Sequence, residues 1–90
     1  MSFETRDNAV VYLDENGSTL AEATFPEESA GIVNIDHTFV DPSLRGQGMA
    51  GQLMRHVADA LRTTGRRAHP TCSYAVTWFE KHSEEGDLLA

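Results

Sequence analysis

The apolar residues of this chain change their spacing once, and glycines mark the change. From Ile32 to Val40 apolar and polar residues alternate, which predicts a β-strand. From Gly48 to Thr64 apolar residues recur every three or four positions, and Gly65 follows as a C-terminal cap, which predicts an amphipathic helix of about four turns. Arg67–His69 precedes a proline and is expected to be a short second strand. Together these segments predict a βαβ unit with two parallel strands.

Two further strands are expected before this unit. Residues 8–14 are rich in β-branched and aromatic side chains, and the Asn16-Gly17 pair after them favours a type I′ hairpin turn. Residues 19–25 are then the returning strand, and a loop across 26–31 leads into the strand described above. The N-terminal half is therefore predicted to be a three-stranded antiparallel meander.

The C-terminal part is predicted to be a second helix, Ser73–His82, with Val76 and Phe79 directed inward. Residues 83–90 are expected to be a flexible tail. A chain of 90 residues forms one domain with a thin core. The expected fold is α+β, with a three-stranded antiparallel meander followed by a βαβ unit and a C-terminal helix.

Charge is distributed unevenly along the chain. The net charge is −7, yet the stretch from Arg45 to Arg67 is basic, with Asp59 as its single acid. An acidic protein is a poor candidate for sequence-independent nucleic-acid binding, which neutralises phosphates over a broad surface. A local basic cluster suits a small polyanion instead. Arg55 and Arg62 fit a solvated helix face equally well, whereas Arg45 lies among glycines.

The single cysteine, Cys72, has no partner for an internal disulfide and is expected to be a reduced thiol. The first residues lack the apolar core of a secretory signal, and no apolar run approaches the roughly 20 residues of a membrane span. We therefore expect a cytoplasmic protein with no membrane partner, either a monomer or a weak dimer.

The loop from Arg45 to Ala50 joins the strand to the helix. Its glycines let a ligand's phosphates approach backbone N–H groups at the positive end of the helix dipole, and Arg45 adds a charge-assisted bond. The glycines at 46, 48 and 51 also match the dinucleotide pattern G-x-G-x-x-G, which needs an acidic residue roughly 20 positions on and further βα units. Residues 71–73 are Thr-Cys-Ser and the chain ends soon afterwards, so a dinucleotide site is excluded.

The same loop resembles motif A of the GNAT superfamily of acetyl-CoA-dependent N-acetyltransferases. In that motif, Arg or Gln is followed after two residues by Gly and, one residue later, by Gly or Ala; Arg45, Gly48 and Ala50 occupy these positions. The flanking segments His37–Asp41 and Pro70–Tyr74 are similar to those of the short, single-domain group of this superfamily. The resemblance covers well over half the chain.

This resemblance implies a coenzyme A site. The backbone of Phe39 and Val40 would pair with the pantetheine arm, and the opening between the strands of Val40 and His69 would admit the thioester. The pyrophosphate would bind to the loop residues Arg45, Gly46, Gln47, Gly48, Met49 and Ala50. Acetyl-CoA would then be the co-substrate.

The sequence also departs from typical members of the superfamily. It lacks the two helices that usually follow the first strand and it lacks the final strand pair, so most of the acceptor-binding wall is absent. Larger members often carry a tyrosine before Glu-Lys in the last helix as general acid, and Phe79 occupies that place here. The acceptor is therefore not implied.

Two side chains are candidates for the chemistry. Cys72 lies at the start of the second helix, where the helix N-terminus and the nearby His69 would favour thiolate and an acetyl-cysteine intermediate; a small buried core cysteine is the equal alternative. His37, on the apolar face of its strand, is a candidate general base or a core histidine, and Thr38 on the other face is expected to contact acceptor or pantetheine. His69 and Cys72 have ligand-like spacing, but zinc needs further protein ligands, so no metal is expected.

The sequence thus predicts an N-acetyltransferase that moves acetyl from acetyl-CoA to an unidentified amine, small molecule or protein, with Cys72 as a candidate carrier of the acetyl group. The alternative is a non-catalytic module that binds acyl-CoA or another protein.

Overall fold

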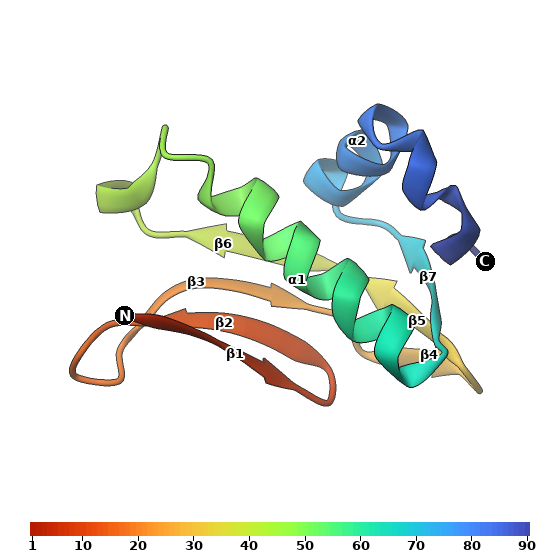
Figure 1. Cartoon of the computed structure of the whole chain (residues 1–90), viewed down its shortest axis with the longest axis horizontal. Coiled ribbons are helices and arrows are strands. Elements are labelled where there is room, and N and C mark those ends of the chain that lie inside the picture. Colours follow the sequence, from red (N-terminus) through yellow and green to blue (C-terminus); the bar gives the residue numbers. More distant parts are fainter.

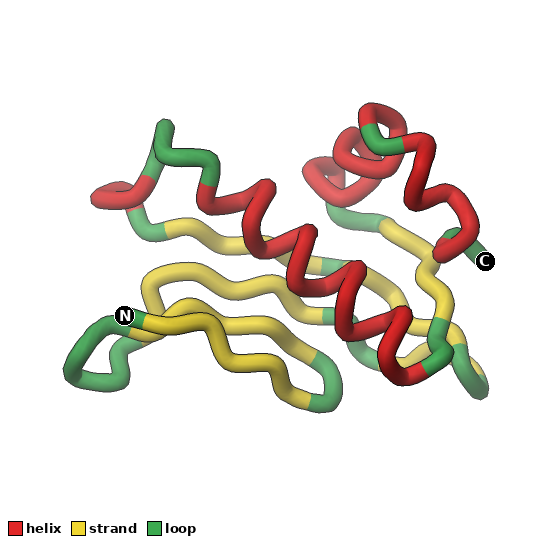
Figure 2. The backbone as a smooth tube through the Cα atoms, viewed as in Figure 1, coloured by secondary structure: helices red, strands yellow, loops and turns green.

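The computed structural model describes the whole chain, residues 1–90. Figures 1 and 2 show a long helix lying across a curved sheet, with a second helix and the C-terminal segment beside it. In chain order the elements are β1 (Ser2–Arg6), β2 (Ala9–Leu13), β3 (Thr19–Thr24), β4 (Glu27–Ser29), β5 (Ile32–Ile35), β6 (His37–Val40), the short 3-10 helix η1 (Pro42–Leu44), α1 (Met49–Thr64), β7 (Arg67–Pro70), α2 (Ser73–Lys81) and a second 3-10 helix η2 (Ser83–Leu88). The fold class is α+β, as predicted.

The strands form two sheets. One has the order β1-β2-β3-β6 and is antiparallel throughout, and the other has the order β4-β5-β7. In the second sheet β4 is antiparallel to β5, and β7 is parallel to it. The parallel pairing of β5 with β7 confirms the predicted βαβ unit. Neither sheet pairs β6 with β7, so the two sheets part between these strands.

The single strand predicted over 32–40 is wrong, because the chain changes sheets at Asp36. The backbone N–H of Asp36 donates to the Thr24 carbonyl and its carboxylate accepts from the Thr24 hydroxyl, which fixes the residue between β5 and β6. A one-residue offset moves every following side chain to the opposite face of a sheet. His37, predicted on the apolar face of the strand, is therefore exposed, as is Phe39.

The core lies between α1 and the four-stranded sheet and continues beneath α2. From α1 it takes the fully buried side chains Leu53, Met54, Val57, Ala58 and Leu61. The predicted end of this helix is confirmed: Gly65 has a φ of +69°, its N–H donates to the Arg62 carbonyl, and the next N–H donates to the Leu61 carbonyl. None of the helices has both the length and the apolar character needed to cross a membrane.

The hairpin between β2 and β3 is not the predicted type I′ turn. That turn needs a positive φ at both central residues, and here only Gly17 has one. The Asp14 carboxylate instead accepts hydrogen bonds from the backbone N–H groups of Asn16 (2.8 Å) and Ser18 (2.9 Å). Because the Asp14 N–H also donates to the Ser18 carbonyl, the loop consists of the three residues 15–17, and Gly17 is the last of them.

Sequence reasoning misses β1 and β4. β4 is exposed along its whole length and β1 half-buries only Phe3, so neither shows the alternation that marks a strand. Both exist because they pair with the more apolar strands β2 and β5. Residues 26–31 are therefore not simply a loop.

The predicted flexible tail is also wrong. Residues 83–88 form η2, Leu88 is 4% exposed, and the N–H of Ala90 donates to the carbonyl of Ala68 in β7. In α2 the inward residues are Ala75, Trp78 and Phe79, whereas Val76, predicted inward, is exposed.

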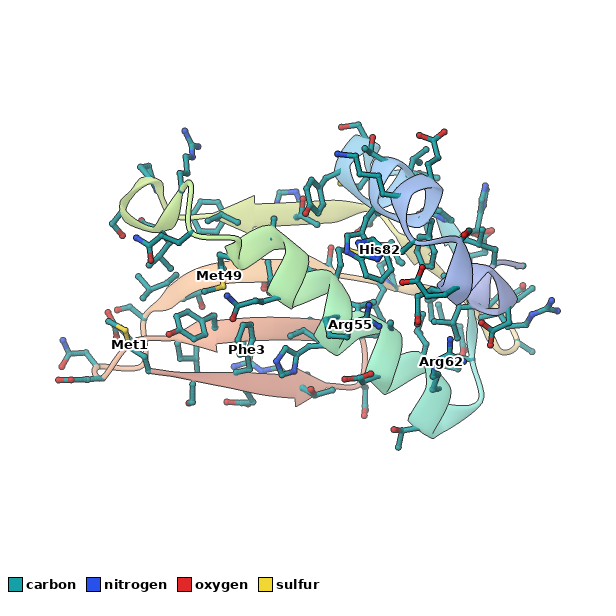
Figure 3. The ribbon with its side chains drawn as sticks, turned by 45° about the horizontal axis from the view of Figure 1, so that its top comes forward. Met1, Phe3, Met49, Arg55, Arg62 and His82 are labelled. Carbon is teal, nitrogen blue, oxygen red and sulfur yellow. The ribbon has the colours of Figure 1, made fainter.

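Ion pairs hold this C-terminal segment on α1. Glu85, which is 8% exposed, lies 3.3 Å from Arg55 and 3.0 Å from Arg62, and Asp87 lies 2.6 Å from Arg62. Figure 3 shows both arginines reaching from α1 toward the segment that follows His82. These two arginines therefore serve the fold, and two of the five arginines in the basic segment are paired with acids.

Candidate active site

The turn between β6 and α1 is built by short-range hydrogen bonds and by glycine. The Asp41 carboxylate caps η1 by accepting from the Ser43 N–H (3.0 Å), and the Gln47 side-chain amide donates to the Ser43 carbonyl (3.2 Å). Gly46 and Gly48 have φ values of +82° and +73°, a region that other residues enter only with strain. The chain thereby turns sharply into α1 at Met49.

The loop offers a row of backbone donors. Gln52 is the first residue of α1 whose N–H finds a carbonyl acceptor, that of Gly48. The N–H groups from 46 to 51 have no acceptor in the chain, and those of the first helical turn lie at the positive end of the helix dipole. Arg45 is exposed beside them and forms no ion pair. This is the arrangement that binds phosphate groups at helix N-termini.

A hollow of about 210 Å³ lies in front of this loop. It is lined by Val40, Leu44, Arg45, Gly46, Gly48, Met49, Ala50, Gly51 and Tyr74. Of the predicted loop residues only Gln47 is absent from the lining, because its side chain turns back to Ser43. A larger hollow of about 380 Å³ lies between β1 and the far end of α1, where only Ala60 is apolar. This lining lacks the apolar residues typical of ligand pockets, so the smaller hollow is the better candidate.

The free edge of β6 faces the gap between the two sheets. The Asp41 N–H donates to the Leu20 carbonyl of β3, so by the two-residue alternation of an antiparallel ladder the backbone of Phe39 also faces β3. The backbone groups of Thr38 and Val40 then point into the gap. The family resemblance implies that the backbones of Phe39 and Val40 would pair with a ligand. The strand register shows that the free backbone groups on this edge belong to Val40 and Thr38, because the backbone of Phe39 faces β3.

Cys72 lies across this gap from β6. It precedes α2 as its N-terminal cap residue, is half-buried, and has its Sγ 3.5 Å from the Thr38 hydroxyl. Burial acts to raise the pKa of the Cys72 thiol, but the Thr38 hydroxyl and the backbone N–H groups of Ala75, Tyr74 and Thr38 outweigh it, so the pKa lies below its ordinary value. The lowered pKa favours the thiolate form of Cys72, which is the form that acts as a nucleophile.

His37 and His69, the two histidines predicted to take part in the chemistry, do not contact the Cys72 thiol. His69 is exposed and its Nδ1 lies 3.2 Å from the Glu28 carboxylate on β4, and it is not among the groups that lower the pKa of Cys72. His37 is exposed, and because neighbouring side chains of a strand alternate, it lies on the opposite face of β6 from Thr38. No group of three or more His, Cys, Asp and Glu side chains is close enough together to hold a metal ion.

One contact and one residue of the site come only from the structure. The contact of Thr38 with Cys72 depends on the break at Asp36, which no sequence pattern marks. Tyr74 lines the hollow from α2, and its half-exposed side chain comes 24 or more positions after the loop Arg45–Ala50 that it faces. Phe79, in the place where larger GNAT enzymes carry a tyrosine, is 6% exposed and packs edge-on to Trp78 as a core residue.

The family model and the solved structures that resemble this chain both point to N-acetyltransferases. The family model of GCN5-related N-acetyl-transferases matches residues 8–88, whereas no curated protein sequence matches the chain. A GCN5-like candidate N-acetyltransferase from Staphylococcus aureus, solved in solution by NMR, is similar at 30% identity, with a TM-score of 0.78 over 99% of this chain and 87% of its own.

Larger acetyltransferases share the fold. The crystal structure of a candidate acetyltransferase from Agrobacterium tumefaciens matches at 22% identity, with a TM-score of 0.66 over 84% of this chain and 57% of its own. The aminoglycoside N-acetyltransferase AAC(6')-Iy, solved in complex with CoA, matches at 22% identity, with a TM-score of 0.55 over 87% of this chain and 65% of its own. The chain thus spans 57% and 65% of the length of these two larger proteins.

Proposed function

Because the chain belongs to the GCN5-related N-acetyltransferase family, we propose that it binds acetyl-CoA at the Arg45–Ala50 loop and transfers the acetyl group, through Cys72, to an amine. Coenzyme A is the co-substrate of this family, and AAC(6')-Iy of the same fold is solved with it. The observation that supports the chemical step is the lowered pKa of Cys72 beside Thr38, at the gap where the thioester would enter.

The loop supports binding through its free donors. The backbone N–H groups from 46 to 51 and the Arg45 guanidinium would take the pyrophosphate oxygens, and the exposed edge of β6 at Thr38 and Val40 would pair with the amides of the pantetheine arm. The hollow of about 210 Å³ is small for a whole nucleotide, which suits a loop that holds only the phosphates.

The proposed chemistry has two steps. First, the Cys72 sulfur attacks the acetyl carbonyl carbon, the bond between that carbon and the coenzyme A sulfur breaks, and the proton given up by Cys72 passes to the leaving thiolate. This thiol exchange is balanced in protons, so it needs no separate general acid, consistent with phenylalanine at position 79. Second, a neutral amine attacks the acetyl-cysteine, the carbon–sulfur bond breaks, and the proton of the amine returns to Cys72.

The test is acetylation of the protein itself. The purified chain is incubated with acetyl-CoA and its intact mass is measured before and after hydroxylamine, which cleaves thioesters but not amides. Lys81 is the only lysine, so a Lys81→Arg background leaves just the N-terminal amine as a competing amide site. We expect a hydroxylamine-sensitive acetyl group that is absent in Cys72→Ala.

The outcomes separate the candidate functions. An acetyl group on Cys72 that a panel of amines removes supports transfer through the cysteine. Catalysed amine acetylation that persists in Cys72→Ala would assign direct transfer from acetyl-CoA and remove the cysteine from the mechanism. Tight binding of acetyl-CoA without transfer to any amine would favour the acyl-CoA-binding module.

A further inference from the structure

One wall of the loop hollow comes from a different helix. Tyr74, the second residue of α2, lines the hollow together with the loop. A Cβ atom at Gly51 would lie 3.8 Å from the Tyr74 hydroxyl, so the phenol oxygen stands beside the first turn of α1. The side chain is 37% exposed and takes no part in the aromatic pairs of the core or in the side-chain hydrogen bonds of the chain. Its hydroxyl is therefore free to bind a ligand.

Several polar groups around this hollow are donors. They comprise the free N–H groups from 46 to 51, the Arg45 guanidinium and the phenol O–H of Tyr74. No carboxylate lines the hollow, and Asp41, which precedes the loop, is engaged by Ser43. Burial raises the pKa of the Tyr74 phenol, which keeps the hydroxyl protonated as a donor. A space that these donors line and that no carboxylate lines is complementary to an anion.

We propose that the Tyr74 hydroxyl donates a hydrogen bond to the pyrophosphate of coenzyme A, so that the first turns of α1 and α2 hold the phosphates between them. This inference rests on the proposed function. Tyr74 lies two residues after Cys72 in the chain, so the same contact ties the phosphate end of the ligand to the helix that carries the thiol. Tyr74 would thus help to set the reach of the pantetheine arm toward Cys72.

The experiment compares ligands that differ in their phosphates. Dissociation constants of the wild type and of Tyr74→Phe are measured by calorimetry for CoA, dephospho-CoA and pantetheine. A hydrogen bond to a charged group is worth about 1.5 kcal/mol or more, so we expect Tyr74→Phe to bind CoA and dephospho-CoA about tenfold more weakly. Its affinity for pantetheine, which lacks the pyrophosphate, should equal that of the wild type.

Tyr12→Phe is the matched control, since Tyr12 is the only other tyrosine, packs against Phe3 and does not line the hollow. It should bind all three ligands as the wild type does, and thermal unfolding should show both variants folded. Equal CoA affinity in Tyr74→Phe and the wild type would overturn the inference while leaving the proposed function intact. If Tyr74→Phe loses affinity for CoA but not for dephospho-CoA, the contact is with the 3′-phosphate. If it also loses affinity for pantetheine, the contact is with the pantetheine arm. Either result would overturn the inference. A wild type that binds no CoA would overturn both.

Discussion

The hydroxyl of Thr38 lies 3.5 Å from the sulfur of Cys72, joining the free edge of β6 to the N-terminus of α2. The two residues are 34 positions apart and belong to elements that share no backbone pairing. Their contact places a thiol at the point where the two sheets part. It also makes the reactivity of the thiol dependent on a residue of the opposite wall.

Removing the Thr38 hydroxyl should make Cys72 less acidic. Thr38→Val keeps the shape of the side chain but loses a group that lowers the pKa of Cys72, so the pKa should rise and the thiolate fraction near neutral pH should fall. The pH dependence of iodoacetamide alkylation measures this directly. Thr71→Val is the control, because the Thr71 hydroxyl donates to Asn34 and does not contact the sulfur. An unchanged alkylation midpoint in Thr38→Val would contradict the assignment.

The face occupied by His37 decides its part in catalysis. Since its side chain lies on the other face of β6 from Thr38, we expect His37→Ala to leave the pH profile of acetyl-Cys72 formation unchanged. The measurement is the rate of hydroxylamine-sensitive acetylation across about pH 5 to 9, the range in which a histidine titrates. Loss of one limb of the profile in the variant would instead identify His37 as a general base.

The left-handed conformation of Gly48 should be costly to replace. Gly48 has a φ of +73°, where an L side chain is destabilised by about 1–2 kcal/mol, so Gly48→Ala should lower the melting temperature by roughly 5 to 15 °C. Gly51→Ala provides the contrast. Its φ is not positive and its Cβ would meet only the Tyr74 hydroxyl at an ordinary 3.8 Å, so its stability should equal or exceed that of the wild type. Equal melting temperatures for the two variants would show that the loop is not held in this conformation.

The buried end of the C-terminal segment should contribute to stability. Leu88 is 4% exposed, and Leu88→Ala should cost about 2–3 kcal/mol, or roughly 10 to 20 °C in melting temperature. Val76→Ala is the control, because Val76 is 38% exposed and its truncation should have little effect. If Leu88→Ala unfolds at the wild-type temperature, the segment is the flexible tail that the sequence pattern indicates.

The ion pair of Asp87 with Arg62 should give an acid-dependent stability. The Arg62 guanidinium lowers the pKa of Asp87 in the folded chain, so the contribution is present above the unfolded-state pKa, near 4, and is lost as pH falls through the lower folded-state value. The wild type should therefore be more stable than Asp87→Asn near neutral pH, with a gap that closes below about pH 4. Urea unfolding across this range measures the gap. Asp59→Asn, at a carboxylate outside the ion pairs, should show no such pH-dependent gap.

Much of the fold follows from local sequence patterns. The limits of α1, its cap at Gly65, the glycine turn before it and the parallel strand after it depend on residues close together in the chain, so the sequence alone predicts them. The loop Arg45–Ala50 was located in the same way, because glycine and arginine at a strand-to-helix junction have a local physical meaning.

The tertiary structure alone decided what that loop faces. The switch of sheets at Asp36 exposes His37 and turns Thr38 to Cys72, and it depends on the pairing of Asp36 with Thr24. Tyr74 reaches the hollow only because α2 stands beside α1. From the sequence, Arg55 and Arg62 could either face solvent or bind a polyanion. In the structure they form ion pairs with Glu85 and Asp87, near the C-terminus. Each of these contacts joins residues distant in sequence, whose meeting is set by how the sheets and helices pack and not by any local pattern.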